Sequence, residues 1–184
     1  MGKEIQLHAD DVALVERVKA GDQKAFEQIV RQYKSMMARV IVGMLGNQSD
    51  ADDVGQEAFI RFYRSVDQYK GDASLGTYLT RIAINLSLNA LKKRKSRQWV
   101  SLEEKHDSMQ RGQSPEHRND DEELVRKALE QLAPKYRAVV VLRLMQGYST
   151  KETAKILKLP LGTVLSRLAR AQERLKPIIE KLEG

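Results

Sequence analysis

Apolar residues recur along most of this chain at intervals of three and four, the spacing that places side chains on one face of an α-helix. No pair of segments shows the strict alternation of apolar and polar residues that is typical of half-buried β-strands. In the first half of the chain the pattern predicts four helices, over residues 10–19, 22–45, 49–66 and 74–95. We therefore expect an all-α fold.

Residues typical of helix ends support these boundaries. Gly21 ends the first helix, and Asp22 is a good N-cap for the second helix, which Gly46 ends. The β-branched run 40–42 is also compatible with a strand, but the length of the segment and its two caps favour a helix. The first turn of the third helix is acidic, which suits the positive end of a helix dipole.

The helical periodicity fails between about residues 96 and 120. This stretch is polar, contains Ser114-Pro115 and has only a few apolar residues, a composition typical of a flexible linker. We therefore predict two small helical domains, residues 1–97 and 121–184, joined by a flexible linker over residues 98–120.

The second half of the chain is also predicted to be helical. A helix is expected near Leu124, and Pro134 then breaks the chain at a position suited to the first turn of the next helix. The dense apolar run 138–145 is compatible with a buried strand. Pro134 before it and Gly147 after it favour a helix of about twelve residues instead.

A short helix, a tight turn and a longer helix follow. Ser149 and Glu152 form the S-x-x-E capping box of the short helix, and the turn over 158–162 leads into the long helix, residues 160–176. The apolar face of the long helix carries Val164, Leu168, Ala171 and Leu175. The opposite face carries Ser166, Ala169, Arg170 and Glu173.

This design suits a helix that enters the major groove of DNA. Arginine pairs with base edges or phosphates, and small residues allow the helix backbone to come close to the bases. The pattern therefore predicts a helix-turn-helix DNA-binding module. An ordinary amphipathic helix with a solvated basic face is the alternative.

Charge and composition narrow the classes of function. The formal net charge of +7 fits a polyanionic partner, although a basic protein without such a partner is the alternative. The chain has no cysteine, which excludes disulfides, zinc fingers and thiol nucleophiles. Since its start does not resemble a signal peptide and no apolar stretch approaches about 18 residues, we expect a cytoplasmic protein.

The acidic segment 50–63 invites a metal-site interpretation, because carboxylates bind hard cations. The three histidines, His8, His106 and His117, fall in the expected tails or the linker, so we interpret these carboxylates as a helix cap and a solvated face. The sequence contains no Ser-His-Asp set, phosphate-binding glycine loop or H-E-x-x-H motif. We therefore expect no catalytic residue, no metal and no cofactor.

Six short motifs together make a family resemblance. They are GDQKAF at 21–26, DVGQEAF at 53–59, YKGDAS at 69–74, YLTRIAIN at 78–85, LAPKYR at 132–137 and LPLGTVLSR at 159–167. In order and spacing, these motifs resemble those of the extracytoplasmic-function sigma factors of bacteria. The resemblance implies a promoter-specificity subunit of RNA polymerase, which is not an enzyme.

The resemblance also implies a polymerase-binding surface and a reader of the −10 promoter element. The residues implied for contact with the clamp helices of the core enzyme are Asp53, Gln56, Glu57, Ile60 and Arg61. The −10 element is bound as a separated strand with one base held outside the stack. The residues implied for that contact are Tyr69, Lys70, Gly71, Asp72, Ala73, Ser74, Arg81, Asn85, Lys92, Lys93 and Arg94. Asn85 matches the position that lines the base pocket, and a solvent-facing helix residue is the alternative for it.

The long C-terminal helix corresponds to the family's reader of the −35 element. The implied contact residues are Thr163, Leu165, Ser166, Arg167, Ala169, Arg170 and Arg174. The chain departs from the family at Leu165, where many members carry a basic residue, so the preferred base sequence is open. Gly55 is also unusual, because glycine within a helix costs about 1 kcal/mol relative to alanine.

The implied partners are core RNA polymerase, promoter DNA and an anti-sigma factor, often membrane-bound, that covers both DNA-reading faces; no small-molecule substrate is implied. Tethering makes two modest DNA contacts act as one. Because only 5% of the residues are aromatic, we expect weak promoter melting that depends on a good promoter match. Two other functions stay open, a regulator that binds duplex DNA alone and a metal-dependent nucleic-acid enzyme.

Overall fold

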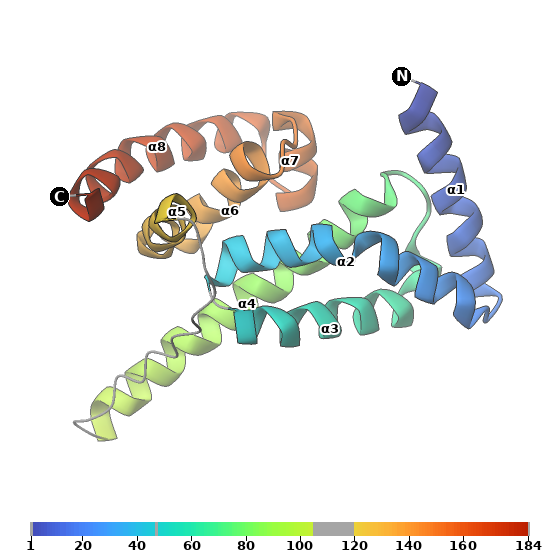
Figure 1. The fold of residues 1–184 in the computed structure, drawn as a ribbon, viewed down its shortest axis with the longest axis horizontal. Helices are drawn as coiled ribbons and strands as arrows, with labels where there is room; N and C mark the ends of the chain where they lie inside the picture. The colour runs from blue at the N-terminus through green and yellow to red at the C-terminus, as the bar shows by residue number, and fades with distance from the viewer. Residues whose placement is uncertain (1, 47, 105–119, 184) are drawn as a thin grey trace.

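The computed structural model describes residues 2–46, 48–104 and 120–183, and it describes side chains within 10–46, 50–96 and 120–183. Throughout these residues the regular structure is helical and no strand occurs, so the all-α prediction is confirmed. The helices form two groups that lie against each other (Figure 1).

The first group, which we call the N-terminal bundle, contains five elements: α1 (Gly2–Lys19), α2 (Gln23–Leu45), α3 (Gln48–Arg64), the 3-10 turn η1 (Val66–Gln68) and α4 (Leu75–Glu104). Helices α2, α3 and α4 lie side by side, and α1 crosses the end at which α2 begins (Figure 1). Each of the four helices contributes a fully buried apolar side chain to the core, for example Val15, Ile29, Phe62 and Leu79.

Helix α2 begins and ends as its sequence predicts. The side chain of Asp22 accepts a hydrogen bond from the backbone N–H of Ala25 at 3.2 Å, which caps the first turn. Gly46 ends the helix with φ of +77° and donates its N–H to the carbonyl of Val42. The run 40–42 lies inside this helix, so the strand alternative is wrong.

Two helix boundaries differ from the prediction. Helix α1 begins at Gly2 rather than near residue 10, and α4 continues to Glu104 rather than ending near residue 95. The prediction used the loss of apolar spacing as a stop signal, but α4 extends beyond the bundle (Figure 1), where a helix needs no apolar face. Most of the predicted linker, residues 105–119, lies outside the described residues.

The second group, which we call the C-terminal bundle, contains α5 (Asp120–Gln131), α6 (Pro134–Val140), the π-helical turn η2 (Val141–Met145), α7 (Thr150–Leu157) and α8 (Leu161–Glu183). Pro134 occupies the first turn of α6, as predicted. The apolar run 138–145 is helical through α6 and η2, so the strand alternative is wrong here too. Ser149 and Glu152 form the predicted capping box of α7.

The two bundles share one apolar core. Four side chains of the C-terminal bundle are at most 2% exposed and pack in the same cluster as Met37, Ile41 and Met44 of α2; they are Ala138, Val141, Leu142 and Ile156. Two smaller clusters hold the C-terminal helices to one another. Since the sequence predicts two domains on a flexible linker, this common core is the main feature that sequence patterns did not indicate.

Candidate nucleic-acid interface

Helices α7 and α8 form a helix-turn-helix whose turn is fixed by backbone hydrogen bonds. Lys158 adopts a left-handed conformation, with φ of +53°, and ends α7. The N–H of Leu159 then donates to the carbonyl of Ala154 at 3.0 Å. Val139, Ala154 and Val164 pack in a small cluster that fixes α6, α7 and α8 relative to one another. The orientation of α8 is therefore set by packing along its apolar face.

The opposite face of α8 is open to solvent. Val164 and Ala171 are completely buried, whereas Leu165 is 55% exposed. Among the other residues predicted to contact the −35 element, Thr163 and Arg167 are half-buried; the exposed ones are Ser166, Ala169, Arg170 and Arg174. The structure therefore brings the predicted −35 residues together along one helix.

Tyr136 of α6 holds two of these arginines in place. The guanidinium of Arg174 lies over the ring of Tyr136, 5.0 Å from its centroid. Burial by itself raises the pKa of the Tyr136 hydroxyl. The hydrogen bond from Arg170 and the positive charges of Lys135 and Arg174 outweigh burial, so this pKa lies below its ordinary value. Such contacts restrict the conformations of the two arginines before any partner binds.

The predicted −10 loop, residues 69–74, is built around Tyr69. The ring of Tyr69 is 4% exposed and packs edge-on against Tyr78, with centroids 5.3 Å apart. Its hydroxyl donates to the carbonyl of Ala73 at 2.8 Å, and Gly71 permits the turn with φ of +78°. At the end of the loop, Ser74 accepts from the N–H of Thr77 and so caps α4. Tyr69 therefore shapes the loop, while Lys70, Asp72 and Ser74 are exposed on it.

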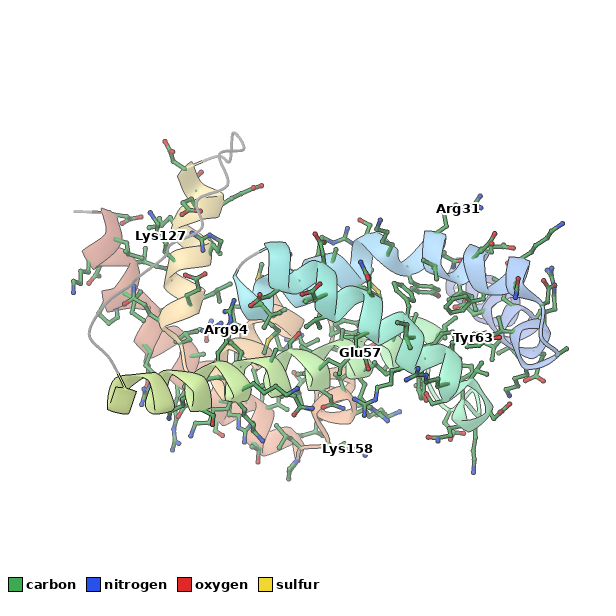
Figure 2. All side chains as sticks on the ribbon, turned by 90° about the horizontal axis from the view of Figure 1, so that it is seen from below. Arg31, Glu57, Tyr63, Arg94, Lys127 and Lys158 are labelled. Atoms are coloured by element: carbon green, nitrogen blue, oxygen red, sulfur yellow. The ribbon has the colours of Figure 1, made fainter. Side chains whose placement is uncertain are left out.

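The predicted −10 residues of α4 have two different environments. Asn85, Lys92 and Lys93 are exposed, and the seven-residue spacing of Asn85 and Lys92 places these two on the same face of α4. Arg81 instead donates to the carbonyl of Lys155 in α7 at 3.0 Å. Arg94 pairs with Asp50 and donates to the carbonyl of Leu45 at 3.3 Å, where α4 passes the end of α2 (Figure 2). Two of the predicted DNA-binding cations are thus engaged by the protein itself.

Helix α3 presents the predicted polymerase-binding residues on its outer side, which faces the viewer in Figure 2. All five are exposed at intervals of three, one, three and one: Asp53, Gln56, Glu57, Ile60 and Arg61. Ile60 and Tyr63 are each 44% exposed, whereas the nearby Ala58 and Phe62 are completely buried. Two exposed apolar side chains within a surface of mixed charge fit a protein partner better than DNA. An added Cβ at Gly55 would meet a single atom within 4 Å, at 3.9 Å, so packing does not require this glycine.

In the part of the chain that the structure describes, neither a metal centre nor a membrane span is indicated. Within the described residues, no group of three or more metal-binding side chains converges on a point. The acidic residues of α3 therefore lack the arrangement that a metal site needs. No helix in the described part of the chain is long and apolar enough to cross a bilayer.

Sequence reasoning missed residues at which the two bundles meet, among them Gly43, Thr80, Arg137 and Tyr148. Gly43 is the one with a signal in the sequence, because a glycine inside an apolar helical segment indicates close approach by another element. The others are ordinary in sequence, and their partners lie far away along the chain.

Two family models match the chain, Sigma-70 region 2 over residues 29–97 and Sigma-70 region 4 over residues 122–175. The RNA polymerase sigma-H factor of Pseudomonas aeruginosa is 34% identical, with 94% of this chain and 95% of the relative covered. The ECF RNA polymerase sigma-E factor of Escherichia coli K12 is 36% identical, with 93% and 97% covered.

A solved structure of the sigma factor RpoE from Bartonella quintana, in complex with the anti-sigma factor NepR, has the same fold. It matches with a TM-score of 0.68 and 22% identity over 85% of this chain and 98% of the other. The helical architecture, the motifs in both bundles and the full-length relatives agree. The chain therefore belongs to the extracytoplasmic-function sigma factors, the non-catalytic subunits that direct bacterial RNA polymerase to promoters.

Proposed function

We propose that this sigma factor docks on core RNA polymerase through the outer side of α3 and binds a promoter at two points. Loop 69–74 and α4 bind the −10 element, and α8 binds the −35 element. The observation that carries this proposal is the open face of α8, which combines small and basic residues on a helix whose apolar back is sealed in a core. We further propose that the protein acts in the cytoplasm, as two domains over 1–97 and 121–184 joined by a linker over 98–120.

For the −35 element, the proposed contacts follow from side-chain chemistry. The major groove is about 12 Å wide and accepts a single helix. Arg170 and Arg167 have guanidinium groups suited to guanine edges or phosphates, and the short Ser166 and Ala169 let the helix approach closely. Leu165 offers an apolar surface, which suits the methyl group of thymine rather than a phosphate.

For the −10 element, the exposed part of α4 supports binding of a separated strand. Asn85 has an amide that both donates and accepts hydrogen bonds, which suits the edge of a base outside the stack. Lys92 and Lys93 lie two turns further along the same helix, where their charges suit phosphates of the same strand.

For partner proteins, the α3 surface and the family support two proposals. The exposed Ile60 lies among charged and polar residues, an arrangement typical of a protein-binding surface. The Bartonella relative was solved with an anti-sigma factor, and we propose that this chain is also controlled by one. The proposed action of the sigma factor is binding. Each promoter element is held by contacts with one bundle, and the tether between the bundles raises the effective concentration of the second contact.

In vitro transcription with purified core polymerase tests the proposal. A promoter selected from a random duplex library by the chain together with core polymerase serves as the template. We expect initiation that needs both the chain and intact −10 and −35 elements. A chain that binds duplex DNA tightly by itself, and supports no initiation with core polymerase, is instead a stand-alone regulator.

A further inference from the structure

Helix α1 is bonded to the start of the proposed −10 loop. The ammonium of Lys19, in the last turn of α1, donates to the carbonyl of Tyr69 at 3.2 Å and to the carboxylate of Glu16 at 2.8 Å. The side chain of Lys19 is only 24% exposed, so the packed chain partly shields this donor from water. The carbonyl of Tyr69 and the N–H of Lys70 belong to one planar peptide group. The contact with Lys19 therefore fixes the backbone at which loop 69–74 begins.

The end of the same loop is connected to α1 through Tyr33 of α2. The hydroxyl of Tyr33 donates to the carboxylate of Asp11 in α1 at 2.5 Å. The ring of Tyr33 lies beside Gly76 in the first turn of α4, where an added Cβ would come within 3.3 Å of a ring carbon. Because Gly76 has no side chain, Tyr33 fits between α1 and the helix into which the loop leads.

Asp11 is itself held in one position. It is 3% exposed, and it also accepts a hydrogen bond from the side-chain amide of Gln32 at 3.3 Å. A buried carboxylate is costly unless hydrogen bonds satisfy it, so Asp11 favours the one placement of α1 that brings it to these donors of α2. Leu14 and Val18 follow Asp11 at helical spacing and are buried in the core. Helix α1 is therefore a firm support for whatever it contacts.

The exposed side chains of the loop lie between these two points of attachment. They are Lys70, Asp72 and Ser74. The loop also contains Gly71, a residue type that adopts many backbone conformations at little steric cost. A loop that is free at both ends loses much conformational entropy when it binds, whereas one that is fixed in the binding conformation loses little. Attachment of both ends therefore bears directly on how well this loop distinguishes one DNA sequence from another.

We propose that α1 sets the −10 preference of this sigma factor by holding loop 69–74 from behind. Lys19 fixes the start of the loop, and Asp11, through Tyr33, fixes α1 against the helix at the end of the loop. Lys19 and Asp11 are positioning residues, because they act through the loop and not by touching DNA. The inference rests on the proposed −10 role of the loop. The Sigma-70 region 2 match begins at residue 29, so both positioning residues lie outside it.

Substitution of Lys19 in the polymerase holoenzyme tests this inference. Lys19→Met removes the charge and the donor but keeps an unbranched side chain, whereas Lys19→Arg keeps both. Lys24→Met is the matched control, since Lys24 is an exposed lysine in the first turn of α2, at the same end of the bundle. Initiation is compared between promoters from the library selection that differ only in the −10 element, and between promoters that differ only in the −35 element.

We expect Lys19→Met to reduce the preference for the selected over an altered −10 element by about three- to tenfold, the effect of losing one hydrogen bond of ordinary net strength. The −35 preference should stay at the wild-type value, and Lys19→Arg and Lys24→Met should keep both preferences. An unchanged −10 preference in Lys19→Met overturns the inference. An equal loss of both preferences also overturns it, since that indicates a general structural defect. So does an equal loss of initiation at every −10 sequence, which indicates a direct contact of Lys19 with phosphate.

Hydrogen exchange in the free chain gives a measurement that does not depend on promoter recognition. Backbone N–H groups of residues 70–74 should exchange faster by about threefold or more in Lys19→Met and in Tyr33→Phe, which lacks the hydroxyl bonded to Asp11. Exchange in α8 should keep its wild-type rates. Unchanged rates in the loop of both variants, or rates raised throughout the chain, contradict the inference. If the wild type does not initiate, the proposed function fails, while exchange in the loop still judges whether α1 holds it.

Discussion

The two candidate DNA readers of this sigma factor differ in how far each is open to solvent. The reading face of α8 is exposed, and its arginines are held by an aromatic ring beside it. In α4, by contrast, Thr80 is buried and Arg81 is bonded to the C-terminal bundle. The same bundle therefore presents one candidate reader and packs against the other, which leaves Arg81 less accessible than Arg170 and Arg174 of α8.

The largest expected effect is on the stability of the contact between the two bundles. Arg137→Ala should lower the free energy of unfolding by about 3–4 kcal/mol, because three buried carbonyls lose a charged donor and each such bond contributes about 1.5–3 kcal/mol, partly offset by relaxation. Urea unfolding measures the loss. The neighbouring exposed Lys135→Ala serves as control and should stay within about 0.5 kcal/mol of the wild type. Equal stability of the two variants would show that Arg137 does not join the bundles.

The next largest effect concerns DNA binding by the exposed face of α8. Arg170→Ala should weaken binding of the polymerase holoenzyme by about 1–3 kcal/mol at promoters with the preferred −35 sequence, and much less at those with an altered one, if Arg170 contacts a base. Competition binding between the two promoters measures this preference. Lys176→Ala, which removes a charge on the flank of α8, should weaken both promoters alike. An unchanged preference in Arg170→Ala would remove this residue from the proposed base contacts.

A smaller effect isolates one hydrogen bond between the two bundles. Thr80→Val and Tyr148→Phe each remove one hydroxyl of a hydrogen-bonded pair, and we expect a coupling free energy of about 1 kcal/mol in a double-mutant cycle on unfolding. Additive effects of the two substitutions would mean that this hydrogen bond contributes nothing to the packing of the two bundles.

The smallest effect is a dependence on pH. The hydrogen bond from Arg126 lowers the pKa of Glu123 from 4.5 to about 2 in the folded chain. The stabilisation is therefore fully present above about pH 4.5 and is lost as the pH falls toward 2. Since the pair is partly exposed, with side chains 25% and 32% accessible, it contributes only about 0.2–1 kcal/mol.

Comparison of the wild type with Glu123→Gln separates this contribution. The difference in urea midpoint between the two proteins should shrink between pH 4.5 and pH 2.5, because the glutamine variant lacks the titrating group. A difference that stays constant over this range would assign the pH dependence of stability to other carboxylates. The variant also tests whether Arg126, freed from Glu123, still holds the carbonyl of Gly46.

The sequence by itself determined the features that depend on near neighbours along the chain. Asp22 and Gly46 define the ends of α2, Ser149 and Glu152 cap α7, and the spacing of Val164 and Ala171 gives α8 its buried face. These signals act within one or two helical turns, so a single sequence displays them. The motifs that indicate the family are short and local in the same way, so the amino-acid sequence alone is enough to predict the family.

Tertiary structure alone decided how the two bundles meet and which candidate DNA-binding residues are free. Arg137 and Met44 are 93 positions apart, and nothing in the local pattern of either residue indicates the other. Arg81 and Arg94 look like solvated cations in the sequence, but the fold places carbonyls within their reach. The sequence near residue 95 also contains no local stop signal for α4. The helix therefore continues to Glu104 through its own backbone hydrogen bonds. The contact between the two bundles depends on the packing of apolar surfaces from distant segments, which local sequence patterns do not display.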